Sequence, residues 1–152
     1  MLSAVDVREV TLEDRRALWE WRNDAVTRKM FNINPNITYR QHCAWFERLM
    51  IDPNRVMYIG RVDFIRAGSV RFNLENADEY SVNLYLKPAY CSGSYGSLIL
   101  NHAVQHLKST RDARKIYSLA RNVNSLVKTT MAEAGFSLVQ EYGKTLRFEM
   151  AL

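Results

Sequence analysis

LYLKPAYCSGSYGS, the stretch from Leu84 to Ser97, decides the fold that we predict for this chain. A strand predicted over Tyr80–Leu86 ends within it, and the apolar residues that follow recur at the spacing of an amphipathic helix. The connection between them is the only segment of the chain that is dense in Gly and Ser. Small residues before a helix N-terminus leave backbone N–H groups open to an anion. We expect either a phosphate-binding turn, with hydroxyl donors on Ser92, Ser94 and Ser97, or a tight turn that needs glycine for geometry alone.

The sequence on both sides of this stretch predicts alternating strands and helices. Thr11 and Thr38 are each followed three residues later by an acid or amide, which is typical of a helix start. The predicted strands are Val5–Val10, Val56–Ile65, Ser69–Leu74, Tyr80–Leu86, Lys115–Ala120, Phe136–Glu141 and Lys144–Met150. The predicted helices are Leu12–Asn23, Thr38–Met50, the segment after Gly96, and Asn124–Ala134, and we expect an irregular loop over Asp24–Ile37.

The order of these elements predicts an α/β (α+β) fold. A helix joins the strand at Tyr80–Leu86 to the strand at Lys115–Ala120, so these two strands should be parallel. Short turns join most of the other neighbouring strands, which favours hairpins. We therefore expect a mixed, mostly antiparallel sheet with one parallel β-α-β unit and helices on both faces. No Pro-rich linker or repeat divides the chain, so we expect a single domain over residues 1–152.

Composition narrows the classes of function. The chain has 47% hydrophobic and 24% charged residues, which is typical of a globular protein, and its two cysteines form no disulfide framework. It has no apolar run of membrane-spanning length and no secretory signal pattern, so we expect a cytoplasmic protein without a membrane partner. The net charge of +5 is spread along the chain without a nucleic-acid-binding motif. His102 and His106 have metal-ligand spacing but no third ligand nearby, so we expect no metal.

The turn and a later helix resemble the GNAT acetyltransferases. The family's loop pattern, [Arg/Gln]-x-x-Gly-x-[Gly/Ala], covers Cys91–Gly96; Gly96 matches, Cys91 replaces the Arg or Gln, and Ser94 replaces a Gly. Asn124-Ser125 and Gly135-Phe136 are similar to the family's Asn-x-x-[Ala/Ser]…Gly-Phe segment. The resemblance implies an acyl-CoA-dependent N-acetyltransferase with acetyl-CoA as cosubstrate. It implies cofactor contacts at Leu84, Tyr85, Leu86, Cys91, Ser92, Gly93, Ser94, Tyr95, Gly96, Ser97, Asn124 and Ser125.

The first third of the chain resembles a narrower branch of that family. The segment Leu18–Asn23 and the later pair Trp45-Phe46 are similar to the nucleotide-sugar amine N-acetyltransferases of the pseudaminic acid pathway. Arginines can pair with phosphates, and aromatic rings can stack on a base or sugar, although the same rings can equally fill the core. The acceptor contacts that we predict are Trp21, Arg22, Asn23, Arg28, Phe31, His42, Trp45 and Asn83.

The resemblance also implies a mechanism. The strands Tyr80–Leu86 and Lys115–Ala120 would splay apart around acetyl-CoA, and backbone groups near Leu84 and Leu86 would polarise the thioester. The family's proton-donating Tyr is Met131 here, so the catalytic candidates are Glu79, Tyr85 and Tyr142. The best acceptor is a small-molecule amine on a nucleotide-linked sugar. The alternatives are a protein N-terminus, or a degenerate domain that binds CoA, a nucleotide sugar or a protein without turnover; the chain would be a monomer or homodimer.

Overall fold

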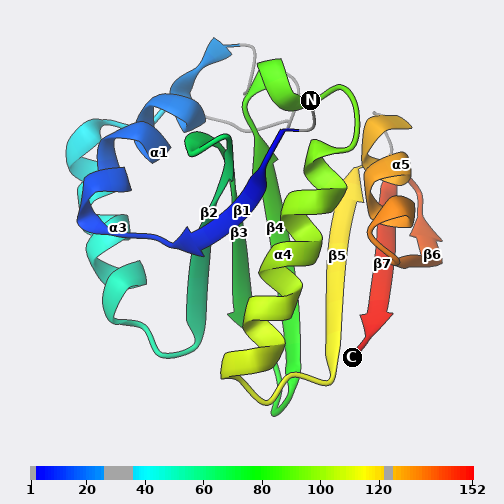
Figure 1. Ribbon diagram of the computed structural model, residues 1–152. Helices are drawn as coiled ribbons and strands as arrows, with labels where there is room; N and C mark the ends of the chain where they lie inside the picture. Colours follow the sequence, from blue (N-terminus) through cyan, green and yellow to red (C-terminus); the bar gives the residue numbers. More distant parts are fainter. Residues whose placement is uncertain (1–2, 26–35, 122–124) are drawn as a thin grey trace.

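The computed structural model describes residues 3–25, 36–121 and 125–152 (Figure 1). Its strands are β1 (Val5–Glu9), β2 (Arg55–Val62), β3 (Ile65–Leu74), β4 (Glu79–Leu86), β5 (Lys115–Arg121), β6 (Ser137–Tyr142) and β7 (Thr145–Ala151). Its helices are α1 (Arg15–Asn23), α3 (Tyr39–Ile51), α4 (Tyr95–Thr110) and α5 (Ser125–Glu133), with short 3-10 turns η1 (Leu12–Asp14) and η2 (Pro88–Tyr90). The element order predicted from the sequence is confirmed.

The strands form one sheet in the order β1-β2-β3-β4-β5-β7-β6. Every neighbouring pair is antiparallel except β4 and β5, which are joined through α4 and run parallel. Figure 1 shows α4 crossing the front of the sheet and α1 and α3 beside β2. The expected fold class, a mostly antiparallel mixed sheet with one parallel unit, is therefore confirmed. No helix among the described residues is both long and apolar enough to cross a bilayer.

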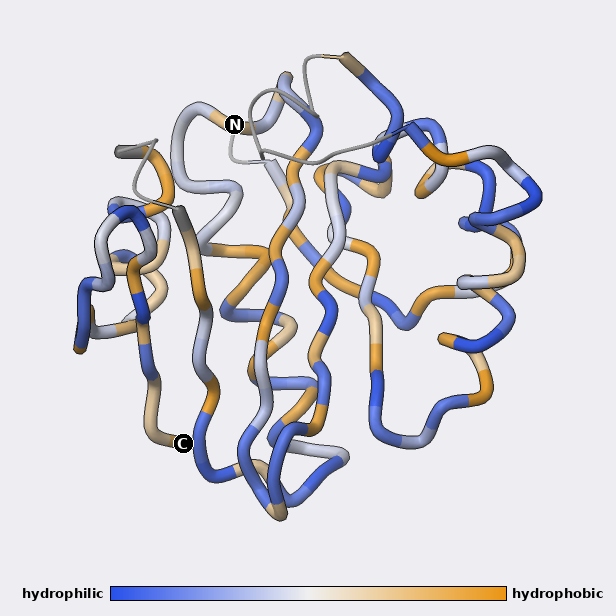
Figure 2. Tube along the Cα trace, turned by 180° about the vertical axis from the view of Figure 1, so that it is seen from behind, coloured by the Kyte–Doolittle hydropathy of each residue, from blue (hydrophilic) through white to orange (hydrophobic). Residues whose placement is uncertain are grey.

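Two apolar clusters lie on opposite faces of the sheet. Even-numbered residues of β3 and β4, such as Val70 and Val82, pack with α4 in the larger cluster. Met57 and Ile59 of β2 pack with α1 and α3 in the smaller one. Side chains alternate between the two faces along each strand. The hydropathy of successive residues alternates accordingly, and Figure 2 shows this as alternating colours along the central strands. Odd-numbered residues of β3 and β4, apart from Ala67 at the register shift between β2 and β3, therefore face the side of the sheet that carries α1 and α3.

One turn differs from the sequence prediction. The sequence predicted a turn at Arg66-Ala-Gly68, but β2 and β3 pair as far as Val62 and Ile65, so only Asp63 and Phe64 connect them. Both have positive φ, 51° and 67°, as a two-residue hairpin of the favoured twist requires. Asp63 accepts the Ala4 N–H with its carboxylate at 2.8 Å and donates its own N–H to the Ala4 carbonyl at 2.7 Å. These contacts hold Asp63 and Phe64 in a positive-φ conformation that non-glycine residues rarely adopt.

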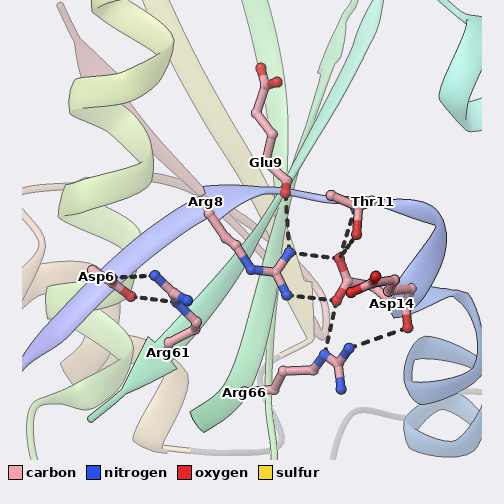
Figure 3. Close-up of polar contacts among 8 residues, drawn as sticks. Asp6, Arg8, Glu9, Thr11, Asp14, Arg61 and Arg66 are labelled. Carbon is pink, nitrogen blue, oxygen red and sulfur yellow. Dashed lines mark hydrogen bonds and ion pairs between the residues drawn. The ribbon is translucent and has the colours of Figure 1, made fainter. Parts of the chain in front are cut away.

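A buried carboxylate ties β1, η1 and β3 together ahead of α1 (Figure 3). Asp14 has a fully buried side chain that accepts two hydrogen bonds of 2.8 Å from Arg8 and one of 2.8 Å from Arg66. The Thr11 N–H donates a fourth bond, also 2.8 Å long. Burial raises the pKa of this carboxyl, but these hydrogen bonds outweigh burial and bring the pKa from the ordinary 3.8 to about 2. Asp14 thus fixes the start of α1.

Replacing Asp14 with Asn should lower the free energy of unfolding at pH 7 by about 3 kcal/mol, because two arginines lose their buried partner. The folded carboxyl has a lowered pKa, so its contribution is complete above pH 3.8 and is lost as the pH falls through about 2. Urea unfolding across this range should show that loss for the wild type and not for D14N. The control is Asp6→Asn, since the Asp6–Arg61 pair is partly exposed and should be worth about 1 kcal/mol or less. Equal losses in the two variants would contradict the role of Asp14.

Candidate active site

The parallel strands β4 and β5 pair only at their beginnings. The ladder joins Glu79 to Lys115, Tyr80 to Ile116 and Ser81 to Tyr117, and then it ends. Both strands continue, β4 to Leu86 and β5 to Arg121. Figure 1 shows them moving apart toward their carboxyl ends. The separation of these two strands that the sequence resemblance implied is therefore present.

The main chain of β4 turns polar groups toward the opening between the strands. Lys87 donates its N–H to the Ala67 carbonyl at 2.8 Å, and the Glu79 carbonyl accepts the Glu75 N–H at 2.9 Å. Odd-numbered residues of β4 therefore bond to β3, with which the whole of β4 is in register. In an antiparallel pair the intervening residues direct their N–H and C=O to the opposite side. The main chain of Leu84 and Leu86 thus faces β5 beyond the end of the ladder.

The Gly/Ser turn lies at the same end of β4. After η2, Ser92, Gly93 and Ser94 are exposed and lead into the first turn of the sixteen-residue α4. Gly93 has a φ of +80° with no heavy atom within 4 Å of an added Cβ, so backbone conformation, and not space, requires glycine here. The first N–H groups of α4 have no acceptor within the helix. The turn combines these donors with the open end of β4.

Two side chains of this turn are used inside the protein. Cys91 is buried, and its Sγ lies 3.9 Å from the Leu86 carbonyl oxygen and 3.6 Å from that of Lys87. Burial raises the pKa of the Cys91 thiol. Ser97 is also buried, and its hydroxyl lies 3.0 Å from the Ser94 carbonyl oxygen and 3.2 Å from Oε2 of Glu133. The exposed hydroxyl donors of the turn are those of Ser92 and Ser94.

Gly96 is the point where α4 approaches its neighbours most closely in this turn. A Cβ on Gly96 would lie 3.0 Å from Cδ1 of Leu86 and 3.0 Å from Cγ2 of Thr130. These atoms belong to β4 and α5, so the missing side chain lets three elements meet behind the turn. Met131, in the family's tyrosine position, is likewise buried in the core.

The predicted acceptor residues divide into two groups. Tyr85 stacks on Trp21 with ring centroids 5.3 Å apart and planes at 26°. The Arg22 guanidinium lies 5.9 Å from the Trp45 ring centroid, and Asn83 is exposed on the same face of β4 as Tyr85. These five side chains line the α1–α3 side of the sheet beside the opening. Trp21 and Trp45 also pack against the smaller apolar cluster, as the core alternative for aromatic residues expected.

Asn23 and His42 hold the connection between α1 and α3. Asn23 donates to the Ile37 carbonyl at 3.0 Å and accepts the Ile37 N–H at 3.1 Å. His42 is buried, and its Nε2 lies 2.8 Å from the Arg15 carbonyl oxygen. Burial lowers the pKa of His42, so the neutral ring donates from Nε2. Both residues position the wall that carries Trp21 and Trp45.

The structure does not bring the three catalytic candidates together. Glu79 lies at the paired end of β4 and accepts a 3.1 Å bond from Arg147. Tyr142 is on the edge strand β6, separated from β4 by β5 and β7. Of the three, only Tyr85 lies beside Leu84 and Leu86. Arg28, Phe31 and Asn124 fall outside the described residues, and Ser125 is the first residue of α5.

Arg71 is the residue of this face that sequence reasoning missed. Its guanidinium carbon lies 5.6 Å from the centroid of the Trp45 ring, the same ring that the Arg22 guanidinium contacts. The only signal in the sequence is an Arg between Val70 and Phe72 in a strand, which marks the face opposite to theirs. The described residues hold no cluster of three or more potential metal ligands.

The comparisons with known proteins agree with this geometry. Spermidine N-acetyltransferase from Vibrio cholerae, solved with CoA and spermine, superposes with a TM-score of 0.85 at 13% identity and covers 97% of this chain and 95% of its own. The chain has the GNAT fold. The Campylobacter jejuni N-acetyltransferase PseH in complex with acetyl coenzyme A gives a TM-score of 0.75 at 12% identity and covers 97% of this chain and 99% of its own. An aminoglycoside acetyltransferase in complex with coenzyme A and kanamycin gives a TM-score of 0.81 at 14% identity and covers 97% of this chain and 95% of its own. No family model matches the sequence, and no curated protein matches it.

Enlarging Gly96 should disturb the junction of β4, α4 and α5. Gly96→Val should lower the free energy of unfolding by about 1–3 kcal/mol, because its methyl groups have no space beside Leu86 and Thr130. Gly96→Ala is the matched variant and should stay near neutral, since the cost of the tight Cβ offsets about 0.5–1 kcal/mol gained by removing a helical glycine. Chemical unfolding measures both, and an unchanged stability of G96V would contradict this packing.

Proposed function

We propose that this protein transfers an acetyl group from acetyl-CoA to a primary amine. The observation that carries the proposal is the main chain of Leu84 and Leu86, which faces an opening where β5 no longer pairs. Solved proteins of the same fold, from Vibrio cholerae and Campylobacter jejuni, hold CoA or acetyl-CoA. Their identity to this chain is low, so the proposal depends mainly on this chain's own geometry.

The residues present fit an acyl-CoA. The main chain of the exposed Ser92, Gly93 and Ser94 and the N-terminus of α4 would bind its diphosphate, since they offer several N–H donors and a favourable helix dipole. Cys91 stands where the family has an Arg or Gln, and it is buried, so this position supplies no positive charge to the loop. Lys87, between β4 and η2, is the basic residue nearest in sequence, and its side chain lies beside Ala17, Glu20 and Trp21 of α1. The pantetheine arm would run along β4 and bond to the main chain of Leu84 and Leu86.

The same strand end can supply the chemistry. Main-chain N–H groups of β4 would donate to the thioester carbonyl oxygen and stabilise the negative charge that develops there. The acceptor amine must lose a proton to attack, and Glu79, paired to Arg147, would accept it only through water. Tyr85 is the titratable side chain closest along β4 to Leu84 and is the better candidate to return a proton to the departing thiolate. Tyr142 remains a more distant candidate on β6.

The acceptor that we favour is an amine on a nucleotide-linked sugar. Trp21, Tyr85 and Trp45 offer ring faces beside the opening, and Arg22 lies over one of them. Stacking on a base or sugar and pairing with a diphosphate are the contacts that such side chains make. The alternative acceptor, a protein N-terminus, needs none of these aromatic faces in particular.

Acetyl-CoA should bind the wild-type protein in a calorimetric titration and raise its melting temperature. Ser94→Asp should weaken this binding by about tenfold or more, because a carboxylate beside the diphosphate repels it. Asp is as good a helix cap as Ser, so the fold should be unaffected. Ser109→Asp, the same charge change at the far end of α4, is the control and should bind normally.

Release of the CoA thiol with a UDP-linked amino sugar then tests transfer. Acetyl-CoA-dependent release that requires the amine is the expected result. Binding of acetyl-CoA without any release over a panel of amines would favour the non-catalytic alternative. Absence of both heat and a melting shift with acetyl-CoA would contradict the proposed function.

A further inference from the structure

Arg71 occupies an unusual place for a charged side chain. It lies on β3 in register with Met57 of β2, which packs in the smaller apolar cluster, so it faces the helices α1 and α3. Its Nε is completely buried and has no hydrogen-bond partner among the described residues. A buried polar atom without a partner is costly, and the cost is larger for a charged group. Among the described residues, the Nε of Arg71 is therefore left without a hydrogen-bond partner.

The surroundings of Arg71 add positive charge. All sixteen acidic residues of the chain lie within the described ranges, and none of them forms an ion pair with Arg71 or with Arg22. The two guanidinium carbons lie 5.6 and 5.9 Å from the same Trp45 ring centroid. Burial first, and then the charges of Arg55 and Arg22, lower the pKa of Arg71. Of these three arginines, only Arg55 has a carboxylate partner, Asp52 at 2.9 Å.

The half-buried Arg71 contrasts with the fully buried Asp14. Asp14 is compensated by two arginines, both at 2.8 Å. Removing the partner of a buried charge typically costs several kcal/mol. A half-buried arginine without a carboxylate partner among the described residues therefore points to an anion that binds from outside the chain. A guanidinium favours carboxylates and phosphates, which it binds through two parallel hydrogen bonds.

Arg71 also lies close to the proposed transfer site. Its register partner on β4 is Asn83, the residue before Leu84, whose main chain faces the opening between β4 and β5. Tyr85, on the same face of β4, stacks on Trp21. Neighbouring strands are about 4.8 Å apart, so an anion at Arg71 and an amine at the opening would be roughly 5–10 Å apart. One small molecule can span this distance.

We propose that Arg71, together with Arg22 over Trp45, binds an anionic group of the acceptor, so that the preferred substrate is an amine that also carries a phosphate or a carboxylate. This assignment rests on the proposed acetyl transfer and narrows its substrate class. A cationic polyamine is disfavoured at such a site, because two uncompensated guanidinium groups repel it. The spermine in the Vibrio cholerae structure is thus a poor guide to the acceptor of this chain.

Paired acceptors test the assignment on the full-length protein. Glucosamine 6-phosphate is compared with glucosamine, and 4-aminobutanoate with 4-aminobutanamide, so that the two pairs separate phosphate from carboxylate. The anionic member of at least one pair should have a kcat/KM about tenfold higher or more. Arg71→Gln should reduce this preference to within about threefold, mainly through KM for the anionic amine, and leave the Kd of acetyl-CoA unchanged. Arg71→Lys should retain part of the preference, because lysine keeps the positive charge but cannot make two parallel hydrogen bonds to the anion.

Arg48→Gln removes an exposed arginine from α3 and is the matched control. It should leave the kcat/KM ratio of the anionic to the neutral amine unchanged in both acceptor pairs. A second readout does not need turnover: inorganic phosphate, compared with chloride at equal ionic strength, should raise the melting temperature of the wild type and of R48Q more than that of R71Q. Without phosphate, R71Q should melt no lower than the wild type, because it removes a half-buried charge that has no carboxylate partner among the described residues.

The outcomes separate the two proposals. Transfer with no preference for anionic amines, or a preference that R71Q retains, would overturn the role of Arg71 and leave acetyl transfer intact. Phosphate stabilisation that depends on Arg71, without any acetyl-CoA binding, would support the anion site and reject the proposed function. Equal phosphate shifts in the wild type and R71Q, with no preference among acceptors, would overturn the anion site.

Discussion

The early end of the β4–β5 ladder is the constraint on which the rest of the site depends. A sheet normally satisfies the N–H and C=O groups of an interior strand from both sides. Here β4 is paired with β3 over Tyr80–Leu86 but with β5 only over Glu79–Ser81. The carboxyl end of β4 therefore keeps main-chain donors and acceptors for something other than the sheet. An extended thioester carrier with its own amides is a chemical match for such an edge.

The remaining elements fix the geometry around that edge. Gly96 lets α4 approach β4 and α5, so the turn with its backbone donors stays at the open end of the strand. On the other face, Asp14 anchors the start of α1, and Asn23 anchors its end to Ile37. The helix in between presents Trp21 and Arg22 to the acceptor side. Stability and recognition are thus divided between residues that lie side by side in the sequence.

The fold could be predicted from sequence because local signals were sufficient for it. The Gly/Ser turn between a strand and a helix marked the parallel unit, and turn residues marked most of the hairpins. The β2–β3 turn was misplaced, because Asp63 and Phe64 hold positive φ through contacts with Ala4 that no local pattern reveals. Asn23 and His42 were predicted to contact the acceptor from the resemblance; in the structure the Asn23 side chain and Nε2 of His42 bond to the backbone. Arg71 was missed because its isolation depends on where every carboxylate lies in space.

A crystal structure of the protein grown with acetyl-CoA tests the central claim most directly. The account predicts the pantetheine between β4 and β5, hydrogen bonded to the main chain of Leu84 and Leu86, with the diphosphate on the backbone of Ser92–Gly96. Acetyl-CoA bound elsewhere on the molecule would contradict it. So would a carrier at the turn whose pantetheine makes no contact with the main chain of β4.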